Sequence, residues 1–294
     1  MKKKLISLAV LGAFAALSGA ALAEDAAAPT AHSHPEEKGV AAGTAPAVAE
    51  PASPHTFTYN IGLFSQYIFR GLTQTDGKPA IQGGVDYSHS SGFYLGTWAS
   101  NISWLEDGGN YDGSSLELDI YGGYRNTIGQ SGIGYDVGLL NYIYPGSKTA
   151  AGRANLAFDD PYTLELYGAL SYKWFQAKLS YALTNDVFGA PNADNTYYLE
   201  ANANIPVGES GFTVNLHVGR QDFDGDVPGT APGDPDNDDL YSYTDWKIGL
   251  TKSWSNGVNV GGYYTDTNAE DAGYTYLGDN IGDSTFTVFV QKTF

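Results

Sequence analysis

Three aspartates in the second half of the chain, Asp222, Asp224 and Asp226, alternate as in a calcium-binding loop, and a second acidic run follows at residues 234–239. Alternating aspartates place carboxylate oxygens on one side of a turn, which suits Ca²⁺, and the first half is similar to the start of an EF-hand loop. The closing glutamate and the flanking helices of that motif are missing. Two interpretations stay open: a solvated acidic loop, and a loop-bound Ca²⁺ as the single cofactor that the sequence suggests.

Catalysis would need a general base, and the chain has five histidines. Three of them precede or begin the predicted barrel, at His32, His34 and His55, and His89 lies in a predicted periplasmic turn. Only His217 lies within a predicted strand, where it faces inward. The sequence offers no nucleophile to pair with it, so a buried polar histidine is the simpler interpretation. We therefore predict that the protein is not an enzyme.

Charged residues also recur on one face of segments that alternate apolar and polar side chains. These inward positions hold the acids Asp86, Glu117, Asp119, Asp136, Glu165, Glu200 and Asp245 and the bases Arg125, Lys173, Lys178 and Lys247. Mixed charge of this kind predicts either a wet pore with a transverse field or a salt-bridged, plugged core. Small inward residues such as Gly84 and Ala169 favour a narrow channel, whereas inward tyrosines such as Tyr121 argue against one. The residues expected to set selectivity are Glu117, Asp119, Arg125, Glu165, Lys178, Glu200 and Lys247.

The segments that carry these residues have the length of tilted membrane strands, about nine to eleven residues. We predict twelve strands, at residues 57–67, 79–87, 92–104, 114–125, 132–143, 161–172, 174–184, 195–205, 211–221, 243–254, 257–267 and 284–294. Twelve is even, as in single-chain bacterial barrels. The third strand does not fit, because Phe93 and Leu95 have one parity and Trp98 and Ile102 the other. A bulge or a mistaken register would account for this.

Long and short connections alternate strictly between these strands. Outer-membrane barrels have short periplasmic turns and long external loops, so this alternation predicts a transmembrane, antiparallel, up-and-down β-barrel with both termini in the periplasm. A soluble all-β barrel or sandwich would also alternate apolar and polar residues. It would have no reason to keep every second connection short, nor to end its apolar stripes in Tyr and Trp.

The first residues have the features of a secretory signal peptide. Three lysines precede an apolar run, and Ala21-Leu22-Ala23 is typical of a cleavage site. We therefore divide the chain into a signal peptide at 1–23, an Ala/Pro-rich periplasmic linker at 24–55 and a barrel at 56–294. Removal of the signal lysines takes the net charge from -18 to -21, which excludes a nucleic-acid partner. The chain has no cysteine, so a disulfide framework is also excluded.

Several blocks of the chain are similar to one bacterial family. They are Ser65 to Thr75 (SQYIFRGLTQT), Pro79 to Tyr87, Gly92 to Asn101, Glu117 to Tyr124 and the ending Val290 to Phe294. On these residues the chain resembles the TorF family of porin-like proteins, also described as the Gcw_chp family, over about Phe57 to Phe294. The resemblance implies an outer-membrane barrel that acts as a channel. It supplies no catalytic or binding residues.

We therefore expect a passive channel for small hydrophilic solutes, with a weak cation preference, in the outer membrane of a Gram-negative bacterium. Its expected partners are outer-membrane lipid and lipopolysaccharide, the solutes, and the barrel assembly machinery, for which the terminal aromatic Phe294 looks like the assembly signal. The alternative is a non-conducting structural or adhesive barrel whose acidic external loops bind Ca²⁺.

Overall fold

The computed structural model describes residues 53–229, 231 and 235–294. The predicted signal peptide and most of the predicted linker lie outside the described residues. Among the residues described, no helix is long and apolar enough to cross a membrane.

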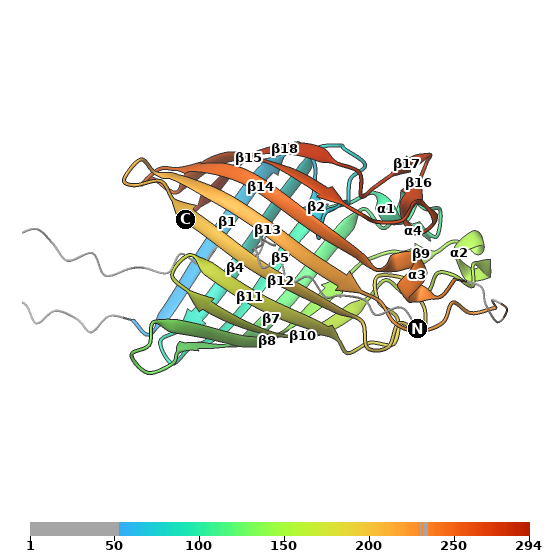
Figure 1. Ribbon diagram of the computed structural model, residues 1–294, viewed down its shortest axis with the longest axis horizontal. Helices are drawn as coiled ribbons and strands as arrows, with labels where there is room; N and C mark the ends of the chain where they lie inside the picture. The colour runs from blue at the N-terminus through green and yellow to red at the C-terminus, as the bar shows by residue number, and fades with distance from the viewer. Residues whose placement is uncertain (1–52, 230, 232–234) are drawn as a thin grey trace, which may run out of the picture.

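Twelve strands of the described chain form a closed antiparallel barrel (Figure 1). They are β1 (His55–Phe64), β4 (Ala80–His89), β5 (Phe93–Asn101), β7 (Leu116–Thr127), β8 (Ile133–Ile143), β10 (Thr163–Tyr172), β11 (Phe175–Ala182), β12 (Tyr197–Pro206), β13 (Phe212–Asp222), β14 (Tyr243–Ser253), β15 (Val258–Thr267) and β18 (Thr285–Thr293). Each pairs with the next along the chain, and β18 pairs with β1 to close the ring. The predicted fold class and all twelve predicted strands are confirmed.

The outer surface of the barrel is apolar. Along β1, the side chains of Phe57, Tyr59, Ile61 and Leu63 are each about half exposed or more. Every other barrel strand also exposes at least one large apolar side chain on its outward face. A soluble protein rarely exposes an apolar surface of this extent. A closed barrel leaves no backbone group unpaired, so it is one of the two structures that can cross a bilayer. We therefore treat the strands as membrane-spanning.

Outward aromatic side chains gather towards both rims of the barrel. Near the short connections they include Phe57, Phe93, Trp174, Phe212 and Trp254. Near the long connections they include Tyr162, Tyr181, Trp246, Tyr264 and Phe286. Two such girdles are typical of outer-membrane barrels, because amphipathic rings prefer the membrane interface.

The strand β5 settles the facing that the sequence left open. Phe93 and Leu95 point outward, with 61% and 57% of their surface exposed, whereas Trp98 points inward and is buried. Its pairing with β4 and β7 is continuous over the described strand, so neither a bulge nor a shifted register is present. Ile102 lies beyond the strand end. The prediction that this strand needed a repair was wrong, because its inward face is itself aromatic.

The connections differ at the two ends of the barrel, as Figure 1 shows. Tight turns join alternate strands at one end, and Lys173 in the β10–β11 turn has a positive φ of 52°. Lys173 is exposed there and does not face the interior, so its predicted inward position was wrong. The long connections at the other end hold short elements: β2 (Ile68–Phe69), β3 (Leu72–Thr73), α1 (Trp104–Asp107), β6 (Tyr111–Asp112), β9 (Ser147–Lys148), α2 (Ala150–Ala154), α3 (Asn237–Tyr241), α4 (Asp271–Tyr274), β16 (Thr275–Tyr276) and β17 (Asp279–Asn280).

Candidate functional site in the barrel interior

The connection between β1 and β4, residues 65–79, turns into the barrel, and we call it the strap. Within it, β2 and β3 pair as a small hairpin, with Phe69 opposite Leu72. Arg70 and Gly71 form the tip of this hairpin and have positive φ angles of 46° and 82°. Two successive positive φ angles are typical of the mirror-image turns that close two-residue hairpins. The first turn position is unusual for arginine, and such an outlier points to a functional role.

The tip of the strap packs directly against the barrel wall. A Cβ atom on Gly71 would lie 2.4 Å from Cγ2 of Thr267 and 2.6 Å from Cβ of Asp245. Glycine is therefore required at this position both by its backbone conformation and by the space available. The close approach fixes the hairpin against β14 and β15 and aims Arg70 across the interior.

Arg70 is the buried centre of the interior. Its Nη2 lies 2.8 Å from both carboxylate oxygens of Glu165 on β10, and its Nη1 donates to Oε1 of Gln221 on β13 at 2.7 Å. The guanidinium also lies 4.3 Å from the ring centroid of Tyr198. A buried charge needs this kind of pairing, because removing an ion from water costs on the order of several kcal/mol for each ion. The strap is therefore tied to the opposite wall through one side chain.

Further contacts fix the rest of the strap. The hydroxyl of Tyr67 donates to Oε1 of Glu117 on β7 at 2.6 Å, and Nε2 of Gln66 donates to Oγ1 of Thr285 on β18 at 2.7 Å. The Tyr67 ring meets Trp98 of β5 edge to face at 5.4 Å. The strap thus contacts walls all around the barrel, and it divides the interior between two cavities that share Phe69 in their lining.

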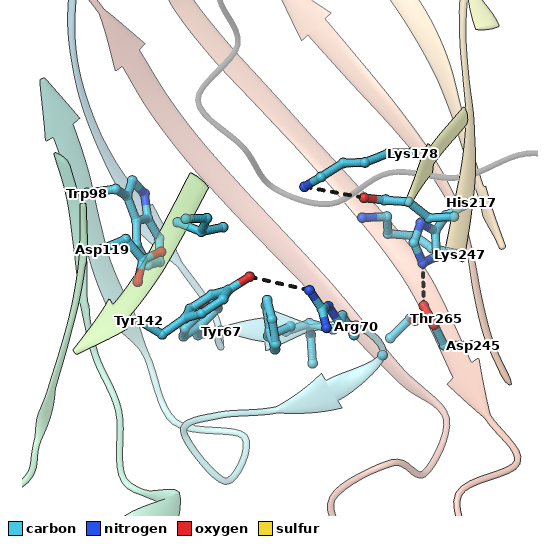
Figure 2. Close-up of a pocket in the computed structure, with 15 residues that line it drawn as sticks. Tyr67, Arg70, Trp98, Asp119, Tyr142, Lys178, His217, Asp245, Lys247 and Thr265 are labelled. Carbon is cyan, nitrogen blue, oxygen red and sulfur yellow. Dashed lines mark hydrogen bonds and ion pairs between the residues drawn. The ribbon is translucent and has the colours of Figure 1, made fainter. Parts of the chain in front are cut away.

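The cavity on the short-turn side of Arg70 is small, about 40 Å³, and charged. Figure 2 shows Asp119 and Trp98 on one side, Lys178, His217, Asp245 and Lys247 on the other, and Arg70 between them. Asp119 on β7 thus faces a wall that holds Lys178 and Lys247 together with the acids Glu200 and Asp245. Acidic and basic side chains therefore both line this narrow space.

The predicted selectivity residues all face the interior, and the structure pairs most of them. Glu117 is 1% exposed and accepts from Tyr67, while Glu165 holds Arg70. Nζ of Lys178 lies 3.7 Å from Oε1 of Glu200. Asp119 lies on the β7 wall, and its Oδ1 has no hydrogen-bond partner among the described residues. Nζ of Lys247 lies 5.0 Å from the ring centroid of Tyr263. The guanidinium of Arg125 lies 4.4 Å from the ring centroid of Tyr94.

His217 belongs to a buried polar group on the same wall. Its Nε2 contacts Oδ1 of Asp245, and the hydroxyl of Tyr198 lies 3.0 Å from Nε2 and donates to Oδ2 of Asp245 at 2.8 Å. Nδ1 has no hydrogen-bond partner among the described residues. The hydrogen-bond partners of Nε2 are a carboxylate and a phenol, so the arrangement is that of a buried histidine held in place.

The three aspartates of the acidic loop lie apart from the interior. Asp222 ends β13 and accepts from Nε of Arg220 at 3.3 Å, and Oδ1 of Asp224 accepts from the backbone N–H of Gly225 at 2.8 Å. Asp226 follows in the loop, where its carbonyl accepts from Asn192. In the described part of the chain, no three His, Asp or Glu side chains stand close enough to hold a metal ion. Residues 230 and 232–234 of this loop lie outside that part, and calcium binding stays a prediction.

Arg70 is the central residue that our sequence analysis missed. The first predicted strand was extended to residue 67, whereas β1 ends at Phe64 and the chain then turns inward. One signal was present: residues 65–75 carry Tyr67, Ile68, Phe69 and Leu72, which are too apolar for a solvated external loop. An Arg-Gly pair between Ile68-Phe69 and Leu72-Thr73, which are β-prone residues, is also consistent with a tight hairpin.

Together, the closed barrel, its apolar outer surface and its charged interior define an integral membrane β-barrel. The family comparison agrees with this class: residues 48–294 match the model of the family described as "Bacterial protein of unknown function (Gcw_chp)". The chain belongs to the Gcw_chp family. No curated protein matches the chain.

Solved structures with a similar fold include outer-membrane porins and channels. NanC porin has 12% sequence identity and a TM-score of 0.46, with 81% of this chain and 98% of that chain covered. KdgM porin in complex with disordered oligogalacturonate has 9% identity and a TM-score of 0.45, with the same coverage of 81% and 98%. An outer-membrane channel from Pseudomonas putida F1 has 11% identity and a TM-score of 0.44, covering 83% and 98%. These values are too low to carry an argument about function.

Proposed function

We propose that this barrel is an outer-membrane channel through which small hydrophilic solutes diffuse passively. The observation that carries the proposal is the contrast between the outer and inner faces of the barrel. One face is apolar and exposed, and the other presents charged and amide side chains such as Asp86, Arg125, Asn204 and Asn215 to the interior. Charged and amide side chains are costly to bury away from water, so a polar interior favours a passage that water and small hydrophilic solutes can enter.

In this proposal the strap is the constriction of the channel. Arg70 stands between Asp119 of β7 and the wall that holds Lys178 and Lys247, so a solute that crosses must pass the Arg70–Glu165 pair. Interiors of twelve strands lie between side-chain-filled and open barrels in width. An inward loop narrows such a barrel without changing its strand number, which makes the passage selective for small solutes.

We further propose a weak preference for cations. The seven acids predicted to face inward remain in the count. Lys173 leaves the set of inward bases because it lies in a turn, and Arg70 joins it, so the inward bases assigned in the described chain are Arg70, Arg125, Lys178 and Lys247. The excess is negative, and the loops at the long-connection end are rich in aspartate. Excess negative charge raises the local concentration of cations and lowers that of anions.

The long-connection end is then external and the short turns are periplasmic, as the connection lengths predict. Outer-membrane lipid and lipopolysaccharide would surround the apolar belt, and the assembly machinery would read the exposed terminal Phe294. These assignments follow from the membrane location, and recovery of the heat-modifiable form in membrane fractions tests them together with it.

The second candidate is a non-conducting structural or adhesive barrel. It is favoured by the packing of Tyr94, Tyr121, Tyr142 and Tyr167 inside the barrel, where all four are buried. Tyr94 donates to Oδ1 of Asp136 at 2.5 Å and also contacts the Tyr167 hydroxyl. Such filling takes up space that a solute would need.

Planar-bilayer recording on the purified protein separates the two candidates. We expect stepwise ohmic conductance for the wild type and a larger step for Arg70→Ala, since that substitution removes the side chain that crosses the interior. No conductance from either protein would contradict a channel and favour the structural barrel. A silent wild type beside a conducting Arg70→Ala variant would contradict passive diffusion and make the strap a plug.

A further inference from the structure

The six long connections converge on a second cavity, on the other side of the strap from the charged one. We call it the aromatic chamber. Each connection in the described chain contributes an aromatic side chain to its lining: Phe69, Trp104, Phe158, Phe188, Phe223 and Tyr274. The chamber has a volume of about 90 Å³. Phe69 of the strap is part of its lining, so the chamber lies directly beside the proposed constriction.

The chamber is uncharged, although the chain as a whole has a net charge of -18. None of the described residues that line it is Asp, Glu, Lys or Arg, and its two side-chain amides are Gln74 and Gln221. Gln221 is engaged at both ends, with Arg70 and with the carbonyl of Tyr197, and Gln74 donates to the carbonyl of Leu72. The other polar side-chain atoms of the lining are the hydroxyls of Tyr144, Tyr241, Tyr243 and Tyr274 and Nε1 of Trp104, which has no hydrogen-bond partner among the described residues. The lining therefore offers a ligand a small number of uncharged polar groups.

The small number of polar groups and the absence of charge in this lining limit the ligand that the chamber can hold. A sugar would leave most of its hydroxyls unpaired, and each unpaired hydroxyl would cost about 1–3 kcal/mol. A charged group would cost more, because the chamber supplies no counter-ion. An uncharged apolar ring costs neither and gains from leaving water.

The geometry of the lining favours an aromatic ring over an aliphatic one. Its side chains already meet edge to face: Phe69 and Phe188 at 5.5 Å and 69°, and Trp104 and Tyr144 at 5.6 Å and 86°. Phe69, Trp104, Phe158 and Phe188 are only partly buried, so their rings still have surface to offer. A further aromatic ring would extend the same edge-to-face packing, which adds to the gain from burial alone.

We propose that the aromatic chamber binds one small, uncharged aromatic ring. The chamber, at about 90 Å³, is smaller than the dry engineered cavity of about 150 Å³ that binds benzene, so it has room for one ring at most. The ring would sit at the external entrance, against Phe69 of the strap. A role of the chamber in solute uptake rests on the proposed channel function. Binding of a ring to the chamber does not, because it does not require that the barrel conduct.

The test measures binding of phenol to the purified, detergent-solubilised barrel by saturation-transfer NMR, with cyclohexanol and glucose as comparison probes. We expect phenol to bind, cyclohexanol to bind more weakly and glucose to give no signal. Ala157→Trp should fill the chamber and weaken phenol binding by about tenfold or more, equivalent to about 1.4 kcal/mol. Phe158→Ala should weaken it as well, because it removes one wall.

The matched control is Leu156→Ala in the same connection, since Leu156 is 65% exposed and lies outside the lining. It should bind phenol as the wild type does. A shift between heated and unheated samples on a detergent gel verifies that each variant retains its barrel. Equal phenol binding by the wild type and Ala157→Trp would overturn the proposal, as would cyclohexanol binding as tight as that of phenol. Phenol binding without any bilayer conductance would keep the chamber and contradict only the channel.

Discussion

Arg70 and Glu165 form an ion pair in the interior of the barrel, with 2.8 Å between Nη2 and Oε2 and with 4% and 3% of their side-chain surfaces exposed. The two residues are 95 positions apart in the chain. This pair joins the tip of an inward loop to the opposite wall, so it fixes the position of the proposed constriction.

Removal of one partner of this pair should destabilise the barrel, because the other charge is left buried. We expect Arg70→Met to lower the free energy of unfolding by about 3–5 kcal/mol and Arg70→Met with Glu165→Gln to recover most of that loss. Urea unfolding in detergent, followed by tryptophan fluorescence, gives the values. The matched control is Lys78→Met, in the exposed pair with Asp76 of the same loop, which should leave the midpoint unchanged. A double variant no more stable than the single one would show that the pair does not hold the strap.

Substitution of Gly71 should displace the hairpin tip. Gly71→Ala introduces a Cβ that clashes with Thr267 and Asp245 and also strains a backbone with a φ of 82°. Gly77→Ala is the matched control, because Gly77 has a φ of 68° in the same loop but open space around the added Cβ. Both variants carry the backbone strain of about 1 kcal/mol or more, and only the first carries the clash. We expect Gly71→Ala alone to change the conductance step, by about twofold, since pore width sets conduction. The same step size in both variants would argue against a strap that narrows the passage.

Charge selectivity should depend on the carboxylates of the interior. Under a KCl gradient we expect a reversal potential that favours K⁺ at about 0.1 M salt, where the screening length is about 10 Å, and a weaker preference at about 1 M. Glu117→Gln with Glu165→Gln should reduce the preference, since it removes a β7 charge and releases Arg70 from its partner. Glu209→Gln with Glu270→Gln removes the same charge from exposed positions outside the interior and should have a smaller effect. Anion preference in the wild type, or equal effects of the two double variants, would mean that these carboxylates do not control the passage.

Phe294 should be needed for membrane insertion. Its backbone N–H donates to the carbonyl of Tyr59 at 2.8 Å, and Tyr59 donates back at 3.3 Å, so it completes the seam between the first and last strands. Its side chain is 67% exposed on the outer surface, where the assembly machinery could bind it. Deletion of Phe294 should reduce the heat-modifiable form in membrane fractions far more than deletion of residues 24–52. Equal losses from the two deletions would contradict an assembly role.

The sequence by itself determined the barrel. A strand between lipid and a hydrated interior must alternate apolar and polar residues with a period of two, and this pattern is local, so it can be read strand by strand. The inward positions of Glu117, Glu165, Lys178 and Lys247 followed from the same parity. Lys173 was misassigned because it lies in a turn, where parity no longer defines a face.

Only the tertiary structure decided what fills the interior. A long connection has no regular alternation of apolar and polar residues that would show whether it turns into the barrel or away from it. Residues 65–79 could therefore not be distinguished from an external loop by their pattern alone. The pairing of Arg70 with Glu165 joins residues far apart in the chain, and the aromatic chamber draws at least one ring from each of six connections. Such contacts depend on closure of the barrel, which brings the ends of all twelve strands together in space. Alternation along one strand carries no information about which residues then meet across the ring.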